Sequence, residues 1–79
     1  MDWQVTVATG INPEGAITGY WYDANFVSHG FLRSRYGTFT TFDPPGSVWV
    51  TPSGINSAGA ITGSYFDANF VEHGFLWRY

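Results

Sequence analysis

The chain contains two copies of one sequence motif, and this repeat constrains its fold more than any other feature. Residues 10–35 read GINPEGAITGYWYDANFVSHGFLRSR and residues 54–79 read GINSAGAITGSYFDANFVEHGFLWRY, an offset of 44 positions. Over residues 11–35, sixteen of the twenty-five aligned pairs are identical. A period of this length, made of turn and strand residues, is typical of stacked β architectures such as propeller blades. One unit of that kind does not cover its own apolar faces, so we expect the protein to function as an assembly of stacked units.

The repeat divides the chain into a first unit at residues 1–44 and a second unit at residues 45–79. Residues 1–10 align with residues 45–54, whereas residues 36–44 have no counterpart among the 79 residues. The chain therefore contains about one and three-quarter units.

Short strands separated by turns are predicted throughout, which makes the fold class all-β and antiparallel. The first unit is expected to have four strands, at residues 3–11, 16–23, 27–35 and 38–43. Pro13 and Gly15 lie where a β-turn uses them, and Pro44-Pro45 ends the unit because proline cannot donate to a strand ladder. The second unit repeats the first three strands at residues 48–55, 60–67 and 71–78, without a fourth.

The hairpin between the second and third strands has a predictable register. We expect Asp23 to pair with Val27 across a three-residue loop. The resulting cross-strand pairs are Trp21 with His29, Gly19 with Phe31, and Tyr20 with Gly30. In the second unit the corresponding pairs are Tyr65 with His73 and Gly63 with Phe75. An aromatic ring opposite a glycine covers backbone that the glycine would leave bare, so these pairs are expected to stabilise the repeat.

The composition favours self-association. Hydrophobic residues make up 44% of the chain, aromatic residues 20% and charged residues only 11%. A domain of this size buries only about 60 to 65% of its unfolded surface, which leaves much of this apolar surface uncovered in a monomer. We therefore predict a homo-oligomer that closes a propeller, with a tetramer favoured and a trimer next.

Several partners are not expected. The three arginines stand against six acidic residues, there is no lysine, and the net charge is −3, so nucleic acid is an unlikely partner. The sequence shows no signal peptide and no apolar run near 18 residues in length, so no membrane association is predicted. The absence of cysteine excludes disulfides and thiolate chemistry.

No catalytic constellation is evident, and we predict a protein without enzymatic activity, cofactor or bound metal. Asp23 and Asp67 stand at hairpin mouths, where an Asx turn is the expected role. A calcium site is the alternative, but two oxygen ligands fall short of the roughly six to eight that calcium takes. His29 and His73 recur at one position, where a structural role competes with metal binding or titration near neutral pH.

The abundant aromatic residues leave a second function open. Exposed rings on a repeat scaffold are able to stack on sugars, so a carbohydrate or small-ligand binding module is the alternative to a structural scaffold. The candidate ligand-binding residues are Trp21, Phe26, Trp49, Phe70 and Trp77.

The run INxxGxIxGxYxDxNxxxHGFL resembles the HAF-type extracellular repeat of bacteria, and GTFTTFDPPG is similar to the segment that links one such repeat to the next. The resemblance implies four-stranded β-propeller blades, with the strand entering Ile11 or Ile55 innermost and the TFTTFD strand outermost. It also suggests an extracellular location, and it implies no shared activity.

The two hairpin loops depart from that family, whose loops usually read D-x-N-G. Both copies here read Asp-Ala-Asn-Phe. A phenylalanine held at positive φ costs roughly 1 to 2 kcal/mol relative to glycine. Either the loop differs from the family's, or Phe26 and Phe70 offset this cost by packing on a neighbouring unit; a ligand surface and simple exposure are the other interpretations.

Overall fold

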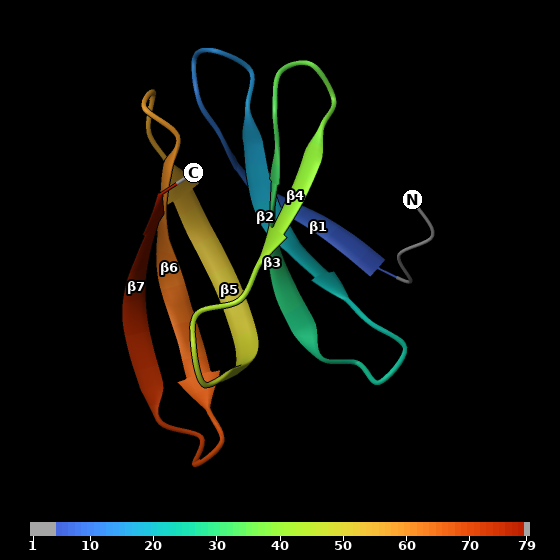
Figure 1. The fold of residues 1–79 in the computed structure, drawn as a ribbon, viewed down its shortest axis with the longest axis vertical. Coiled ribbons are helices and arrows are strands. Elements are labelled where there is room, and N and C mark those ends of the chain that lie inside the picture. Colours follow the sequence, from blue (N-terminus) through green and yellow to red (C-terminus); the bar gives the residue numbers. More distant parts are fainter. Residues whose placement is uncertain (1–4, 79) are drawn as a thin grey trace.

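A computed structural model describes residues 5–78 and shows two antiparallel sheets, one for each repeat unit (Figure 1). The first sheet has the order β1-β2-β3-β4, the second has the order β5-β6-β7, and neither sheet closes on itself. The strands are β1 (Val5–Ile11), β2 (Ile17–Tyr22), β3 (Ser28–Arg33), β4 (Phe39–Phe42), β5 (Ser47–Ile55), β6 (Ala60–Asp67) and β7 (Glu72–Arg78). The predicted all-β, antiparallel class is confirmed. Within residues 5–78, no helix has the length and apolar character needed to cross a membrane.

The turns form where the sequence predicts them. Gly15 has a φ of 90° and its N–H donates to the Asn12 carbonyl at 3.0 Å. The Asn12 side chain accepts a hydrogen bond from the Ala16 N–H at 2.9 Å, and Asn56 repeats this bond with Ala60 at 3.0 Å. The part of the predicted first strand at residues 3–4 lies outside the described residues.

The predicted register of both hairpins is confirmed. Trp21 pairs with His29, Gly19 with Phe31 and Tyr20 with Gly30 in the first sheet; Tyr65 pairs with His73 and Gly63 with Phe75 in the second. A Cβ atom on Gly19 would lie 2.9 Å from the Phe31 ring, and one on Gly63 would lie 3.0 Å from the Phe75 ring. The phenylalanines therefore cover the glycines as expected.

The expected cover over Gly30 is different from the one observed. A Cβ atom on Gly30 would lie 2.6 Å from the ring of Phe42, a residue of β4, and the ring of Tyr20 is not among its nearest neighbours. The reason is that β4 pairs with the other side of β3 and sets Phe42 directly opposite Gly30. The third strand of a sheet has two neighbours, and the hairpin alone reveals only one of them.

The core lies between the two sheets. Leu32 and Phe42 of the first sheet pack against Val50 and Ile61 of the second. Polar groups also join the sheets, since the Ser28 hydroxyl donates to the Val50 carbonyl at 2.8 Å and accepts from its N–H at 2.7 Å. One face of each sheet is buried in this way, as expected for units that stabilise each other by stacking.

Candidate functional site

The hairpins β2–β3 and β6–β7 turn at the same end of the molecule (Figure 1). In the first hairpin, Asp23 Oδ1 accepts hydrogen bonds from the N–H groups of Asn25 at 2.8 Å and Val27 at 3.1 Å. In the second hairpin, Asp67 Oδ1 accepts from Asn69 at 2.8 Å and Val71 at 3.1 Å. The predicted Asx turns are confirmed, and each aspartate keeps one oxygen for another partner.

In the first unit that second oxygen contacts a histidine held between two carboxylates. His29 Nε2 lies 2.9 Å from Asp23 Oδ2, and His29 Nδ1 lies 2.8 Å from Asp43 Oδ1. The Trp21 ring packs against the imidazole with ring centroids 4.6 Å apart. Because a carboxylate accepts but does not donate, both bonds form together only when the imidazole carries both protons.

The environment of this cluster shifts the pKa of two of its members. Partial burial lowers the pKa of His29, but the hydrogen bonds and charges of Asp23 and Asp43 outweigh it, so the pKa is raised above 6.5. The hydrogen bond from His29, followed by that from the Val27 N–H, lowers the pKa of Asp23 below 3.8. Asp23 and His29 therefore form a charged pair from mildly acidic pH to near neutrality.

The second unit contains only part of this cluster. His73 Nε2 lies 2.8 Å from Asp67 Oδ2, and the ring stacks on Tyr65 with centroids 5.1 Å apart. The hydrogen bond from His73 lowers the pKa of Asp67. The second unit has no counterpart of Asp43 within the 79 residues, and among the described residues His73 Nδ1 has no hydrogen-bond acceptor.

The two carboxylates of the first cluster lie at opposite nitrogens of one imidazole, so they do not converge on a common point. Across residues 5–78, no group of three or more histidine or acidic side chains is arranged to hold a metal ion. The loop carboxylates already bind backbone N–H groups and histidine, and the geometry gives the calcium interpretation no support.

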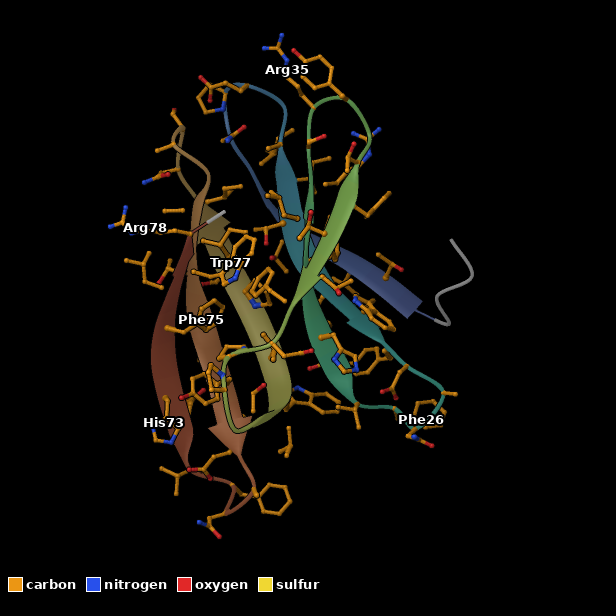
Figure 2. The ribbon with its side chains drawn as sticks, in the orientation of Figure 1. Phe26, Arg35, His73, Phe75, Trp77 and Arg78 are labelled. Atoms are coloured by element: carbon orange, nitrogen blue, oxygen red, sulfur yellow. The ribbon has the colours of Figure 1, made fainter. Side chains whose placement is uncertain are left out.

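The five candidate ligand-binding aromatics fall into two groups. Phe26 and Phe70 are 72% and 80% exposed, on loops at the hairpin end, where Figure 2 labels Phe26. Both have positive φ, 60° and 59°, so the strained loop expected from the sequence is present. The three tryptophans are half-buried against other rings: Trp21 on His29, Trp49 on Tyr22 at 5.1 Å, and Trp77 on Phe42 at 4.4 Å.

Sequence reasoning missed the role of Asp43 as the second acceptor for His29. A signal for it exists, because Asp43 is the last residue of the strand predicted at residues 38–43. Pairing that strand with β3 brings Asp43 to the level of His29 and Phe42 to the level of Gly30.

Comparison of the chain with models of protein families, with curated proteins and with solved structures found no match.

Proposed function

We propose that the protein is a non-enzymatic, self-assembling repeat protein whose copies stack sheet on sheet and close into a β-propeller. One observation carries this proposal: equivalent positions of the two units are buried in the first unit and exposed in the second. The face of the first sheet that bears these positions is covered by the second sheet, and the same face of the second sheet has no neighbour among residues 5–78.

The difference in burial is clearest at identical residues. Leu32 is 5% exposed, whereas Leu76, its equivalent, is 59% exposed. Thr18 is buried and Thr62 is exposed, although each donates a hydrogen bond to the opposite phenylalanine carbonyl, at 2.9 and 3.0 Å. The second sheet thus repeats this local structure, but among residues 5–78 this face of it has no neighbouring sheet.

The opposite end of the chain presents the complementary face. Ile55 packs against the core between the sheets, whereas its equivalent in the first unit, Ile11, is 68% exposed. The core residues Leu32 and Ile61 recur on the uncovered faces as Leu76 and Ile17, whereas Val50 corresponds to Thr6 and Phe42 has no counterpart among the 79 residues. A contact between different faces of identical chains is heterologous, and it closes as a ring or continues as a fibre.

A ring is the form that a soluble product would take. Propellers contain roughly four to eight blades, so four copies with eight units are favoured and three copies with six units are next. The resemblance to HAF-type repeats supports the same arrangement, since it implies blades.

The junction between copies differs from the internal one at one position, because Glu72 replaces the buried Ser28. The junction between copies is therefore expected to use a carboxylate acceptor where the internal junction uses a hydroxyl.

Two variants test the proposal. Leu76→Glu places a charge on one uncovered face and Ile11→Glu on the other, and both sites are exposed within the chain. We expect the parent to show the mass of a closed oligomer in light scattering and each variant to be a monomer. Mixing the two variants should give a heterodimer, because each retains the face that the other has lost.

Tyr36→Glu serves as the matched control, since Tyr36 is an exposed aromatic residue in the turn before β4. This variant should assemble as the parent does. A monomer mass for the parent at micromolar concentration would contradict the proposal, and so would homo-oligomers of both Glu variants.

The exposed phenylalanines of the hairpin end favour a second function, a module that binds carbohydrate or another small ligand. Two large apolar rings in strained conformations at equivalent positions are unusual when both rings are largely exposed. A glycan array distinguishes the two functions: a scaffold gives no signal, and a binding module gives a signal that Phe26→Ala and Phe70→Ala together abolish.

A further inference from the structure

We propose that the outer edge of β7 is a docking site for one extended strand in which a phenylalanine is directly followed by an aspartate. The site is an edge of the second sheet, and its occupation does not require the face-to-face stacking proposed above. The first unit shows what such a strand does, because β4 occupies the equivalent edge of β3.

The backbone of β7 offers an open ladder. β3 pairs with β2 on one side and with β4 on the other, whereas within residues 5–78 β7 pairs only with β6. Figure 1 shows β7 at the outside of the second sheet with no strand beyond it. Unpaired N–H and C=O groups along a strand edge are a template for strand addition.

The surface beside this edge has a notch for an aromatic ring. In the first unit, Phe42 fills the space next to Gly30, 2.6 Å from the position of a Cβ atom. At Gly74, the equivalent glycine, the nearest atom to that position is the Gly63 carbonyl oxygen at 3.9 Å. The glycine is retained in the second unit, but no described ring covers it.

On the other face of the same edge lies His73, which has a hydrogen-bond partner at one ring nitrogen, Nε2. His29 contacts Asp23 through Nε2 and Asp43 through Nδ1, while His73 contacts Asp67 through Nε2. A carboxylate at the level of Nδ1 would accept a hydrogen bond from the Nδ1–H and would complete the second cluster, as Asp43 completes the first. Hydrogen-bond complementarity therefore specifies aspartate in the added strand.

A hollow of about 450 Å³ lies along this edge, between β7 and the segment that follows β4. Its lining includes Gly74, Phe75 and Trp77 on one side and Asp43 to Pro45 on the other. Figure 2 shows His73, Phe75 and Trp77 in succession along β7, with Phe75 and Trp77 on the side of the first sheet. The edge is thus accessible at the level where the aromatic and acidic side chains of an added strand would lie.

The register of the added strand follows from the first sheet. Phe42 lies opposite Gly30, and the next residue, Asp43, reaches His29 on the other face. Successive residues of a strand point to opposite faces, so a Phe-Asp pair satisfies Gly74 and His73 together in one antiparallel register only.

The test uses a synthetic peptide with the sequence of residues 36–44, YGTFTTFDP, added to the Ile11→Glu chain. That variant has an intact β7 edge and is expected to be monomeric, so strand binding is separated from assembly. At about pH 6, titration calorimetry should show one peptide per chain, and hydrogen exchange should show new protection of the β7 amides. The peptide with Ala in place of the Phe before Asp should bind at least about tenfold more weakly.

Two controls identify the contacts. Gly74→Ala is expected to leave the free chain unchanged, because its Cβ has room, but to weaken peptide binding about tenfold by filling the notch. The peptide with Asn in place of Asp should bind more weakly to the chain with His73, and this loss should disappear in His73→Gln. Unchanged peptide binding by Gly74→Ala, or equal binding of the Asp and Asn peptides to the chain with His73, would overturn the proposal. Equal binding of a scrambled peptide would overturn it too. Concentration-dependent protection of β7 without peptide would also overturn it, since a second copy would then occupy the edge.

Discussion

At the scale of single residues, Phe26 and Phe70 show how loop length determines backbone conformation. The Phe26 N–H donates to the Asp23 carbonyl at 3.0 Å, and the Asp23 N–H donates to the Val27 carbonyl at 3.0 Å, which closes the hairpin in three residues. The last residue of such a loop takes the left-handed conformation whatever its side chain. The loop therefore places a phenylalanine at positive φ although glycine would fit with less strain.

Substitution of Phe26 separates backbone strain from the effect of the ring. Phe26→Ala keeps a Cβ at positive φ and should change the free energy of unfolding by less than about 0.5 kcal/mol, because the ring is exposed. Phe26→Gly should be about 1 kcal/mol more stable than Phe26→Ala. Urea denaturation in the Ile11→Glu background measures the stability of both variants. Phe70→Ala and Phe70→Gly repeat the comparison in the second unit. Equal stability of the Gly and Ala variants would show that the loop relaxes.

The histidine cluster gives the chain a defined pH dependence. His29 has a pKa raised above 6.5 in the folded state, so its stabilising effect is complete below pH 6.5 and is lost as the pH rises through the folded pKa. Asp23 has a pKa lowered below 3.8, so its effect is present above pH 3.8 and is lost as the pH falls through the folded pKa. The cluster stabilises the fold most between these limits.

We expect the free energy of unfolding to fall between about pH 6 and pH 8 in the parent, and to fall less in His29→Gln. Titratable groups common to both proteins cancel in this comparison. Asp43→Asn should reduce the same slope, because it removes one of the two carboxylates that face His29. Parallel stability curves for the parent and His29→Gln would contradict the assignment.

At the scale of strands, the two hairpins share a register but differ in how firmly their rings are held. Phe31 is almost fully buried, lying over Gly19 and beside the Phe39 ring of β4 at 5.9 Å. Phe75 lies over Gly63 in the same way but is only half-buried, since the second sheet has no described counterpart of β4. The sequence predicts equal roles for the two rings, and the structure distinguishes them.

Phe31→Ala should therefore destabilise the chain by roughly 3 to 5 kcal/mol, as truncation of a buried phenylalanine does. Phe75→Ala should cost less in the monomer, about 1 to 2 kcal/mol. Denaturant titration in the Ile11→Glu background compares them directly. A Phe31→Ala variant within about 1 kcal/mol of its parent would show that the ring does not pack on Gly19 in solution.

The glycines of β3 and β7 provide a matched pair. Gly30→Ala drives a methyl group against the Phe42 ring and should destabilise the monomer by about 1 to 3 kcal/mol. Gly74→Ala meets no atom closer than 3.9 Å and should be nearly neutral. Thermal unfolding of both variants measures the contrast; equal effects would show that Phe42 does not cover Gly30.

At the scale of the whole molecule, residues 5–78 form one sheet of four strands and one of three, in which β7 pairs only with β6. Joining TFTTFDP to Tyr79 should supply a fourth strand to the second sheet and raise the melting temperature by several degrees, about 4 to 8 °C for each kcal/mol gained. It should also suppress association through strand edges. The same extension with alanine in place of the phenylalanine before the aspartate is the control. An unchanged melting temperature, with rapid hydrogen exchange in the added residues, would show that β7 already has a partner.

The sequence determined the features that depend on neighbouring residues. The turn at Gly15, the Asx bonds of Asp23 and Asp67 and the hairpin pairing of Trp21 with His29 follow from loop length and side-chain alternation, whereas most strand ends differ from the prediction by one or two residues. The repeat extends each of these local features to the second unit. For that reason the fold class and the hairpin register could be predicted without the structure.

Only the tertiary structure decided which surfaces are covered. Phe42 over Gly30 and Asp43 on His29 depend on the register of β4, and the contrast between Leu32 and Leu76 depends on the packing of one sheet against the other. The same leucine, threonine and glycine occur at equivalent positions in both units, so no local sequence pattern distinguishes the two units. Burial arises from contacts between residues far apart in the chain. Within residues 5–78, burial reveals the uncovered faces of the two sheets, and the strand order reveals the unpaired edge of β7.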